Sequence, residues 1–223
     1  MLSYFMVEFK GITLKWTGHA GFQITDDDKI LYIDPYKLGK QFNDLNNAHL
    51  VLISHNHFDH LSIDDLHKII NVNTLVIAAN ECLAQLKDLN VKDIRGVGPD
   101  ETITFGNILI KTIPAYNTNK EFHPKKDDKV GFIITINNIV IYHTGDTDVI
   151  PEMKMINPDI ALTPVSGTYV MTAEEAAVAV NDLIRPTKMA IPMHYDSIVG
   201  TKDDAIRFSE LVTVCSTKIL EKE

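Results

Sequence analysis

The sequence contains little cysteine: Cys82 and Cys215 are its two thiols in 223 residues, and no C-x-x-C pair occurs. Isolated thiols exclude a disulfide-stapled scaffold and a cysteine-based zinc site. Basic residues are also few, 21 Lys and Arg against 30 Asp and Glu, so the formal net charge is -9 at pH 7. The densest basic stretch, residues 125–129, is interrupted by two aspartates. The sequence therefore predicts no nucleic-acid partner.

Long apolar runs are missing as well. No stretch approaches the roughly 20 residues that span a bilayer, and the first residues lack the basic and apolar regions of a signal peptide. These absences predict a cytoplasmic protein without membrane contact. With 45% hydrophobic residues, 223 residues suffice for one sizeable core and are few for two independent domains. We therefore expect a single domain over residues 1–223.

Short runs rich in β-branched residues predict two strand-rich halves. In the first half the expected strands are 12–16, 21–25, 30–33, 50–53 and 75–78, with Asp26, Asp27 and Asp28 as a hairpin turn. In the second half they are 102–105, 108–113, 130–136, 139–142 and 189–191. Helices are expected after Ser62, over 81–89, from Thr172 through Ile184 and over 202–212; Ser62 and Thr172 begin capping-box patterns. This alternation predicts two sheets stacked face to face with helices outside.

The most informative segment is residues 55–60, which read His-Asn-His-Phe-Asp-His directly after the apolar run 50–53. Three imidazoles and a carboxylate so close together would repel and desolvate one another in a core, whereas a divalent cation accepts all four as ligands. A solvated polar loop is the simpler alternative, but chance rarely assembles this pattern. The sequence therefore predicts a metal site formed by His55, His57, Asp59 and His60.

Three further polar residues follow apolar strands. Asp34 follows 30–33, Asp146 lies shortly after 139–142, and His194 lies shortly after 189–191. Taken alone, an Asp after a strand is more often a turn residue, and a lone His is more often a core side chain. Taken with the histidine cluster, the three residues indicate loops that converge on one edge of a sheet.

The whole chain resembles the metallo-β-lactamase-fold hydrolases, and within them the small single-domain branch that includes ascorbate-6-phosphate lactonase. The segments that carry the resemblance are 18–20, 33–35, the histidine cluster, 145–147 and 192–195. The resemblance implies an α/β fold, a four-layer αββα sandwich with two metals at one sheet edge. It also implies that His55 and His57 bind the first metal, that Asp59, His60 and His194 bind the second, and that Asp146 bridges them. Asp34 would support the histidine loop from behind the ligands.

One ligand of the family pattern is missing. Most relatives carry a His near the end of the strand that is followed here by Asn117. His123 could replace it, Asn117 could bind through its amide oxygen, or the first metal site could be weak. We expect His123 to be the substitute, because Pro124 restricts it to extended geometry and its loop leaves the same strand end.

This ligand set predicts metal-assisted hydrolysis. Two cations bridged by a carboxylate can hold a water, lower its pKa toward about 7 and deliver hydroxide to a carbonyl carbon or to phosphorus. Asp59 or Asp146 would orient the water, and Tyr116, His123 or Tyr195 would polarise the oxyanion or protonate the leaving group. Zinc is the default for His-rich sites, and Mn(II) or Fe(II) tolerates the same ligands. The expected substrate is a small phosphodiester or phosphorylated lactone, and the protein could be a homo-oligomer.

Two other classes stay open at this point. Iron-dependent sulfur dioxygenases of the same fold share the H-x-H-x-D-H pattern, and a non-catalytic, metal-stabilised interaction protein would explain the missing ligand. Of the remaining histidines, His19 is expected to form hydrogen bonds near the site, and His143 to pack beside it or to take part in catalysis. His49 and His67 are expected on the surface.

Overall fold

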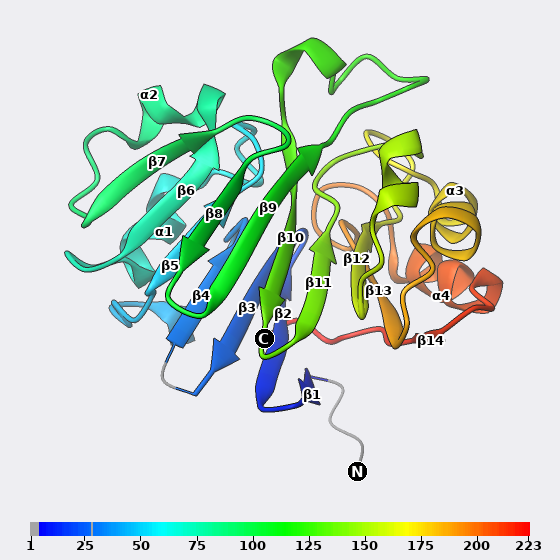
Figure 1. The fold of residues 1–223 in the computed structure, drawn as a ribbon, viewed down its shortest axis with the longest axis horizontal. Helices are drawn as coiled ribbons and strands as arrows, with labels where there is room; N and C mark the ends of the chain where they lie inside the picture. Colours follow the sequence, from blue (N-terminus) through cyan, green and yellow to red (C-terminus); the bar gives the residue numbers. More distant parts are fainter. Residues whose placement is uncertain (1–4, 28) are drawn as a thin grey trace. The chain divides into compact units, whose positions relative to one another are not determined.

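The structure, a computed structural model, describes residues 5–27 and 29–223. The chain forms two compact units. The N-terminal unit comprises the described residues through Val97 together with Leu220–Glu223, and the C-terminal unit comprises Gly98–Ile219. Each unit contains one seven-stranded sheet (Figure 1). That residues 1–223 form a single domain stays a prediction.

The sheet of the N-terminal unit follows chain order across its width. Its strands are β1 (Met6–Phe9), β2 (Ile12–Gly18), β3 (Gly21–Asp26), β4 (Lys29–Ile33), β5 (Leu50–Ile53), β6 (Leu75–Ala79) and β7 (Asp93–Val97). Pairs from β1 to β4 are antiparallel, and pairs from β4 to β7 are parallel. The carboxyl ends of β4, β5 and β6 therefore share one edge. The end of β2 joins them, because β2 and β4 are both antiparallel to β3.

Burial explains why these runs form strands. All four residues of β5 are fully buried, as expected for a central parallel strand covered on both faces. In the antiparallel strand β2, Ile12, Leu14 and Trp16 are buried, and the alternating residues Thr13 and Lys15 are partly exposed. The period of two therefore marks one buried face.

The helices of this unit are short. They are the 3₁₀ turn η1 (Lys40–Phe42), α1 (Ile63–Ile69), the 3₁₀ turn η2 (Asn80–Cys82) and α2 (Leu83–Leu86). Ser62 caps α1 by accepting a hydrogen bond from Asp65 N, which confirms the predicted start. The helix expected over 81–89 is shorter in the structure. The Leu89 amide donates to the Leu86 carbonyl in a tight turn, so the series of helical hydrogen bonds ends there.

The sheet of the C-terminal unit has the strand order β14-β13-β12-β11-β10-β9-β8. These strands are β8 (Thr102–Phe105), β9 (Ile108–Pro114), β10 (Val130–Ile136), β11 (Ile139–His143), β12 (Ile160–Pro164), β13 (Met189–Met193) and β14 (Ser216–Thr217). Pairs from β8 to β11 are antiparallel, and pairs from β11 to β14 are parallel. The carboxyl ends of β9, β11, β12 and β13 therefore lie at one edge of this sheet.

Two helices of the C-terminal unit contact each other and the sheet: α3 (Ala173–Val178) contacts β12, and α4 (Lys202–Leu211) contacts β13 (Figure 1). Thr172 and Glu175 form the predicted capping box of α3. A π-helical segment, η5 (Ala179–Ile184), continues α3 to the predicted end. The remaining turns are 3₁₀: η3 (Lys125–Asp127) and η4 (Pro151–Met155).

The sequence predictions missed β1, β7, β12 and β14. The edge strands β1 and β7 carry charged residues such as Glu8, Asp93 and Arg95, which weaken the apolar pattern and protect a sheet edge. The predicted hairpin turn includes Asp27, which has a positive φ of 48°, while Asp28 lies outside the described residues.

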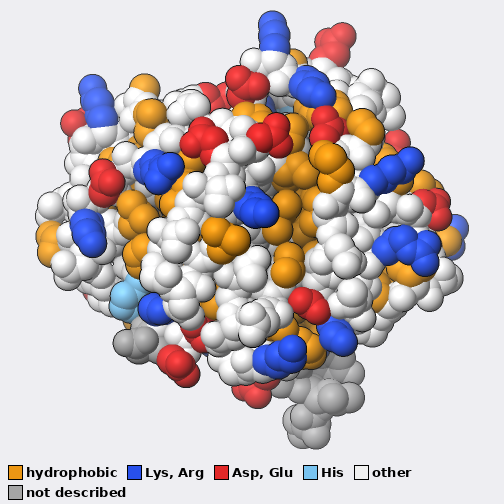
Figure 2. Space-filling model, in the orientation of Figure 1, with side chains coloured by type: hydrophobic (Ala, Val, Ile, Leu, Met, Phe, Trp, Pro, Cys, Tyr) orange, Lys and Arg blue, Asp and Glu red, His pale blue; other side chains and the backbone are white. Residues whose placement is uncertain are grey.

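Three further features concern the surface charge, the helices and the cysteines. Acidic and basic side chains are interspersed on the face seen in Figure 2. Among the described residues, no helix has the length and apolar character needed to cross a membrane. Cys82 is buried, Cys215 is partly exposed, and the two do not form a disulfide with each other.

Candidate metal centre

The histidine cluster of the N-terminal unit begins directly beyond β5. His55 and His60 are buried with 1% and 0% exposure, and Asp59 is 8% exposed. His55 Nε2 and His57 Nδ1 lie 3.1 Å apart, and the rings of His55 and His60 have centroids 4.0 Å apart. The loop therefore gathers its imidazoles at the carboxyl end of one buried strand, as the sequence predicts.

Asp34, at the end of the neighbouring strand β4, contacts this loop from behind. Its Oδ2 lies 2.8 Å from His60 Nδ1, and its two oxygens accept hydrogen bonds from the Ser54 backbone amide (2.8 Å) and hydroxyl (2.6 Å). An ionised carboxylate only accepts, so His60 donates from Nδ1 and its Nε2 carries the lone pair. This is the arrangement in which an outer carboxylate orients a metal-binding imidazole.

His19 lies beside the cluster and contacts Asp59. It occupies the turn after β2, its Nε2 lies 2.8 Å from Asp59 Oδ2, and it is 1% exposed. His19, Asp59 and His60 each offer one potential ligand atom, and these atoms lie within 4.8 Å of one another. The predicted hydrogen-bonding role of His19 is therefore present, and His19 also belongs to a possible donor set that the sequence reading did not include.

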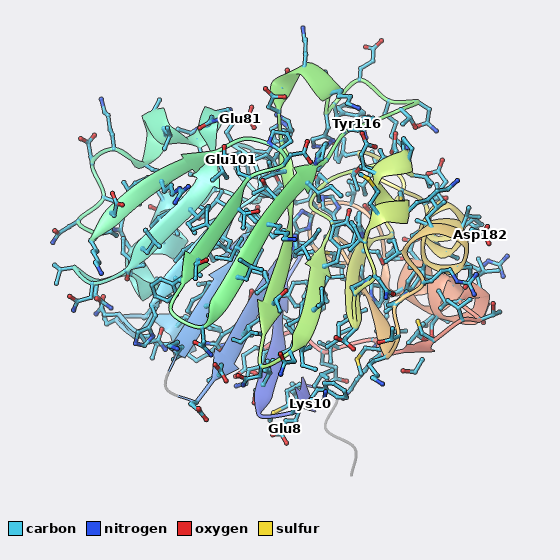
Figure 3. The ribbon with its side chains drawn as sticks, in the orientation of Figure 1. Glu8, Lys10, Glu81, Glu101, Tyr116 and Asp182 are labelled. Carbon is cyan, nitrogen blue, oxygen red and sulfur yellow. The ribbon has the colours of Figure 1, made fainter. Side chains whose placement is uncertain are left out.

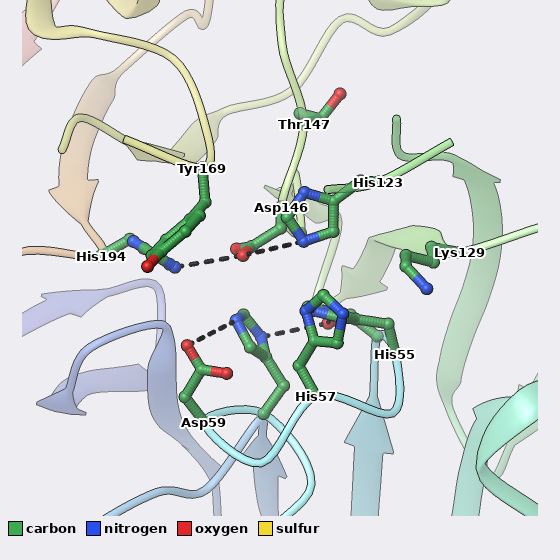
Figure 4. A network of polar contacts seen from close by, with 12 residues as sticks. His55, His57, Asp59, His123, Lys129, Asp146, Thr147, Tyr169 and His194 are labelled. Carbon is green, nitrogen blue, oxygen red and sulfur yellow. Dashed lines mark hydrogen bonds and ion pairs between the residues drawn. The ribbon is translucent and has the colours of Figure 1, made fainter. Parts of the chain in front are cut away.

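In the C-terminal unit, Asp146 is the centre of a second donor set. Asp146 Oδ2 lies 3.1 Å from His194 Nε2 and 3.5 Å from His123 Nε2 (Figure 4). Asp146, His123 and His194 have 3%, 1% and 0% exposure, so one carboxylate and two imidazoles are buried together. They come from three segments: the turn after β11, the loop between β9 and β10, and the end of β13.

Local backbone geometry positions these side chains. Gly145, immediately before Asp146, has a φ of 64°, and a Cβ there would lie 2.8 Å from Val130 O, so glycine is required at this turn. His194 has a φ of 62°, and in the N-terminal unit His19 and Asp34 have φ values of 54° and 43°. These three residues come directly after β2, β4 and β13, and the left-handed backbone turns the chain at each of these strand ends.

Asn117, at the position of the missing family ligand, contacts His123. Its Oδ1 accepts hydrogen bonds from the His123 backbone amide (2.9 Å), and His123 Nδ1 lies 3.2 Å from the same oxygen. The Asn117 backbone amide donates to His123 O at 2.8 Å. The loop that carries His123 therefore folds back onto Asn117, which agrees with the predicted proximity of the two residues.

Both predicted catalytic tyrosines are buried. Tyr116 is labelled in Figure 3. Its OH donates to Glu152 Oε2 at 3.0 Å and accepts from Lys125 Nζ at 3.4 Å, so its hydroxyl already has polar partners. Burial, reinforced by the hydrogen bond to Glu152, raises the pKa of Tyr116. Burial also raises the pKa of Tyr195, with a smaller contribution from Asp196. Each hydroxyl is therefore protonated at neutral pH and could act as a donor.

Several supporting residues escaped the sequence analysis. Ser54 bonds to Asp34, Ser166 Oγ lies 2.9 Å from His194 Nδ1, and Glu81 accepts from the Asn56 amide at 3.0 Å. Asp148 Oδ2 accepts from Thr118 N at 2.8 Å. Their positions in the sequence could have indicated them, because Ser54, Glu81 and Ser166 each follow the end of a parallel strand.

The other histidines agree with their expected places. His143, at the end of β11, is fully buried and accepts a hydrogen bond from Gly145 N at 3.2 Å. His67 is exposed on α1, and His49 is exposed while accepting from Ile30 N at 3.1 Å. His67 therefore offers a surface position for control substitutions.

Comparisons with known proteins agree with this donor chemistry. The beta-lactamase superfamily domain family matches residues 13–194. A UPF0173 metal-dependent hydrolase of Pyrococcus horikoshii is 31% identical over 212 residues, covering 90% of this chain and 92% of the relative. One of Caldivirga maquilingensis is 32% identical over 209 residues, covering 89% and 88%. A solved structure from Parabacteroides distasonis, named as a metal-dependent hydrolase, is 25% identical with a TM-score of 0.83 and covers 98% of both chains.

The fold and the family match define this protein as a member of the metallo-β-lactamase superfamily. The predicted α/β fold class, the αββα metallo-β-lactamase fold, is confirmed by these likenesses. Within the superfamily, the chain belongs to the UPF0173 metal-dependent hydrolases. The predicted enzyme class, a metal-dependent hydrolase, is confirmed as well.

The residues present fit the metal that this family implies. Buried imidazole nitrogens and carboxylate oxygens are the ligands that zinc, manganese and iron share, and each unit supplies both kinds. In each set, hydrogen bonds hold imidazoles from the side opposite the potential ligand atom. A divalent cation bound by such a set would balance the charge of the buried carboxylate.

Proposed function

We propose that this metal-dependent hydrolase cleaves a small phosphodiester or a lactone, including a phosphorylated lactone. The proposed ligands of up to two divalent cations are His55, His57, Asp59 and His60 from the N-terminal unit and His123, Asp146 and His194 from the C-terminal unit. Zinc is the expected cation, and Mn(II) or Fe(II) suits the same donors. When bound, the cations supply Lewis acidity and an activated water.

One observation carries the proposal: the burial of Asp146 with His123 and His194 on either side of the same carboxylate oxygen. Both imidazoles present a ring nitrogen toward this oxygen, and imidazole nitrogens and carboxylate oxygens are shared ligands of a divalent metal. The arrangement supports a bridging role for Asp146.

The chain's own residues have distinct proposed roles in the reaction. Asp59 or Asp146 would orient the attacking water, and His19 would orient Asp59 through their 2.8 Å contact. Tyr195 donates a hydrogen bond to the developing oxyanion or protonates the leaving group. Tyr116 is less suited to that role, because Glu152 and Lys125 already engage its hydroxyl.

His123 is the proposed replacement for the missing family ligand. The amide oxygen of Asn117 lies within hydrogen-bond distance of both the His123 backbone amide and Nδ1, so it is occupied by donors. His123 Nε2, in contrast, lies on the side of Asp146. These contacts favour His123 over Asn117 as the ligand.

Chelation followed by reloading tests the function. Protein stripped with a chelator and reloaded with zinc, manganese or iron is assayed on bis(p-nitrophenyl) phosphate and on a panel of simple and phosphorylated lactones. We expect hydrolysis that chelation abolishes and one of these cations restores. Absence of turnover with every cation, or oxygen uptake with iron in place of hydrolysis, would contradict the proposal. His67→Ala, at an exposed position, is the control and should match the wild type.

A further inference from the structure

Asn117 has hydrogen-bond partners that fix the orientation of its amide. Its Oδ1 faces the His123 backbone N–H at 2.9 Å, and its Nδ2 faces Tyr169 O at 3.0 Å. A backbone N–H only donates and a carbonyl oxygen only accepts, so a flipped amide would lose both hydrogen bonds. The amide oxygen must therefore point toward His123.

That orientation determines which nitrogen of His123 carries its proton. His123 Nδ1 lies 3.2 Å from the same Asn117 Oδ1. Because an amide oxygen cannot donate, the hydrogen bond requires a proton on Nδ1. In the neutral imidazole, Nε2 then carries the lone pair, and Nε2 is the atom 3.5 Å from Asp146 Oδ2. A ligating imidazole binds a metal through the nitrogen that carries the lone pair, and this tautomer presents that nitrogen on the side of Asp146.

We infer that Asn117 is a positioning residue that holds His123 as the Nδ1–H tautomer, so that His123 Nε2 binds the metal. The inference rests on the proposed function, because it assigns a role toward the metal bound there. Asn117, at the position of the family ligand, thereby acts through His123 and not as a ligand itself.

The chemistry of the orienting partner predicts unequal metal affinities. His60 is oriented by the carboxylate of Asp34, whereas His123 is oriented by a neutral amide. A carboxylate partner raises the basicity of a ligating imidazole more than an amide does. The cation that uses His123 is therefore the more weakly bound of the two.

The tautomer can be measured directly in zinc-loaded, full-length protein labelled with [15N]histidine. Long-range proton–nitrogen correlation distinguishes a protonated Nδ1 from a metal-bound Nε2, and the His123→Ala variant identifies the His123 signals. We expect Nδ1–H with a zinc-bound Nε2 in the wild type. A proton on Nε2 in the zinc-loaded wild type would overturn the inference.

Two substitutions separate positioning from general structural support. Asn117→Leu removes the acceptor, and we expect it to weaken the weaker zinc equivalent by roughly 10 to 100-fold in competition titrations while the tighter equivalent is unchanged. Asn117→Asp keeps an acceptor toward His123 and should keep the tautomer. Equal behaviour of Asn117→Asp and Asn117→Leu, or wild-type zinc affinity in Asn117→Leu and His123→Ala, would refute the positioning role.

Asp146→Ala and His67→Ala distinguish this inference from the proposed function. If Asp146→Ala loses zinc while Asn117→Leu and His123→Ala bind it normally, the inference fails and the proposed function stands. If Asp146→Ala also keeps both zinc equivalents, the proposed site itself is wrong. His67→Ala should bind zinc as the wild type does in every case.

Discussion

The two units of this protein use the same strand scheme and supply their ligands in opposite ways. In each unit, strands at one end of the sheet pair in antiparallel fashion and those at the other end in parallel fashion. The N-terminal unit supplies its proposed ligands from one loop, residues 55–60, whereas the C-terminal unit supplies His123, Asp146 and His194 from three separate segments. The positions of ligands in a contiguous motif depend on one turn, whereas the positions of ligands in a dispersed set depend on the conformations of several loops.

The residues that orient the histidine side chains also differ between the two units. In the N-terminal unit the carboxylate of Asp34 contacts His60, whereas in the C-terminal unit a serine hydroxyl contacts His194 and an amide contacts His123. Charged partners hold an imidazole more strongly than neutral partners do. Loss of such an outer partner should therefore lower metal affinity more in the N-terminal set than in the C-terminal set.

Removal of a ligand should have the largest effect, and it should be equal in both units. We expect His57→Ala, His60→Ala and Asp146→Ala each to abolish hydrolysis, a loss beyond the roughly 10 to 100-fold that outer partners cause. Each variant should stay folded, because the sheets supply stability through their buried cores. Activity on bis(p-nitrophenyl) phosphate and circular dichroism check this. Near-normal rates in all three variants would place the chemistry elsewhere.

Removal of a residue that orients a ligand should change zinc affinity to a different extent in the two units. Asp34→Asn replaces the carboxylate against His60, and Ser166→Ala removes the hydroxyl against His194. We expect zinc affinity to fall by roughly 10 to 100-fold in Asp34→Asn and by less in Ser166→Ala, since the carboxylate contributes more to ligand basicity. Competition titration with a chromogenic chelator measures both. A larger loss in Ser166→Ala would break the comparison.

The loop that carries Asn117 depends on Asp148. The buried Asp148 carboxylate accepts hydrogen bonds from Thr118 N and from Lys120 Nζ, at 2.8 and 2.7 Å. Asp148→Ala should therefore lower the free energy of unfolding by about 1 to 3 kcal/mol, and it should also weaken metal binding.

Asp65 offers a matched control in the N-terminal unit. Its carboxylate holds the Lys37 and Leu38 amides at 2.7 and 3.0 Å, in a segment without proposed ligands. Asp65→Ala should lose similar stability in urea unfolding. Zinc affinity should fall more in Asp148→Ala than in Asp65→Ala, and the reverse order would show that loop support is not specific to the dispersed set.

The smallest expected effect concerns Glu152, which supports Tyr116 at the start of the same loop. Burial tends to raise the pKa of Glu152, but hydrogen bonds from Lys125 and Tyr116 outweigh it and the net pKa is lowered. A lowered carboxylate pKa stabilises the folded state above the usual Glu pKa of about 4.3, and that stability is lost as the pH falls through the folded-state pKa.

Thermal unfolding of Glu152→Gln tests this pH dependence. The variant should melt slightly below the wild type at pH 7, because partly exposed pairs contribute little, and the difference should shrink in acid. A difference that grows toward acid pH would reverse the assigned sign.

The sequence predicted the contiguous motif well and the dispersed supports poorly. Residues 55–60 were identifiable because four donors adjoin one apolar strand. The link from Asn117 to His123 depends on a loop that folds back over six positions, which no periodicity encodes. Ser54 and Ser166 resemble ordinary turn residues until the parallel register places them beside Asp34 and His194.

The fold shows the same contrast. Strands with a regular apolar pattern, such as β2 and β10, were predicted within a few residues of their bounds. β12 was missed although all five of its residues are buried and turn residues flank it, since periodicity does not distinguish a short buried strand from a buried helix.

Metal stoichiometry tests the central claim most directly. Wild-type protein, gently purified from metal-replete medium and dialysed to equilibrium against zinc or manganese, is compared with His60→Ala and Asp146→Ala by elemental analysis. The account predicts up to two ions per chain in the wild type and reduced binding in both variants, because each unit supplies required ligands. A wild type that retains no metal, or an Asp146→Ala variant that retains as much as the wild type, would contradict it.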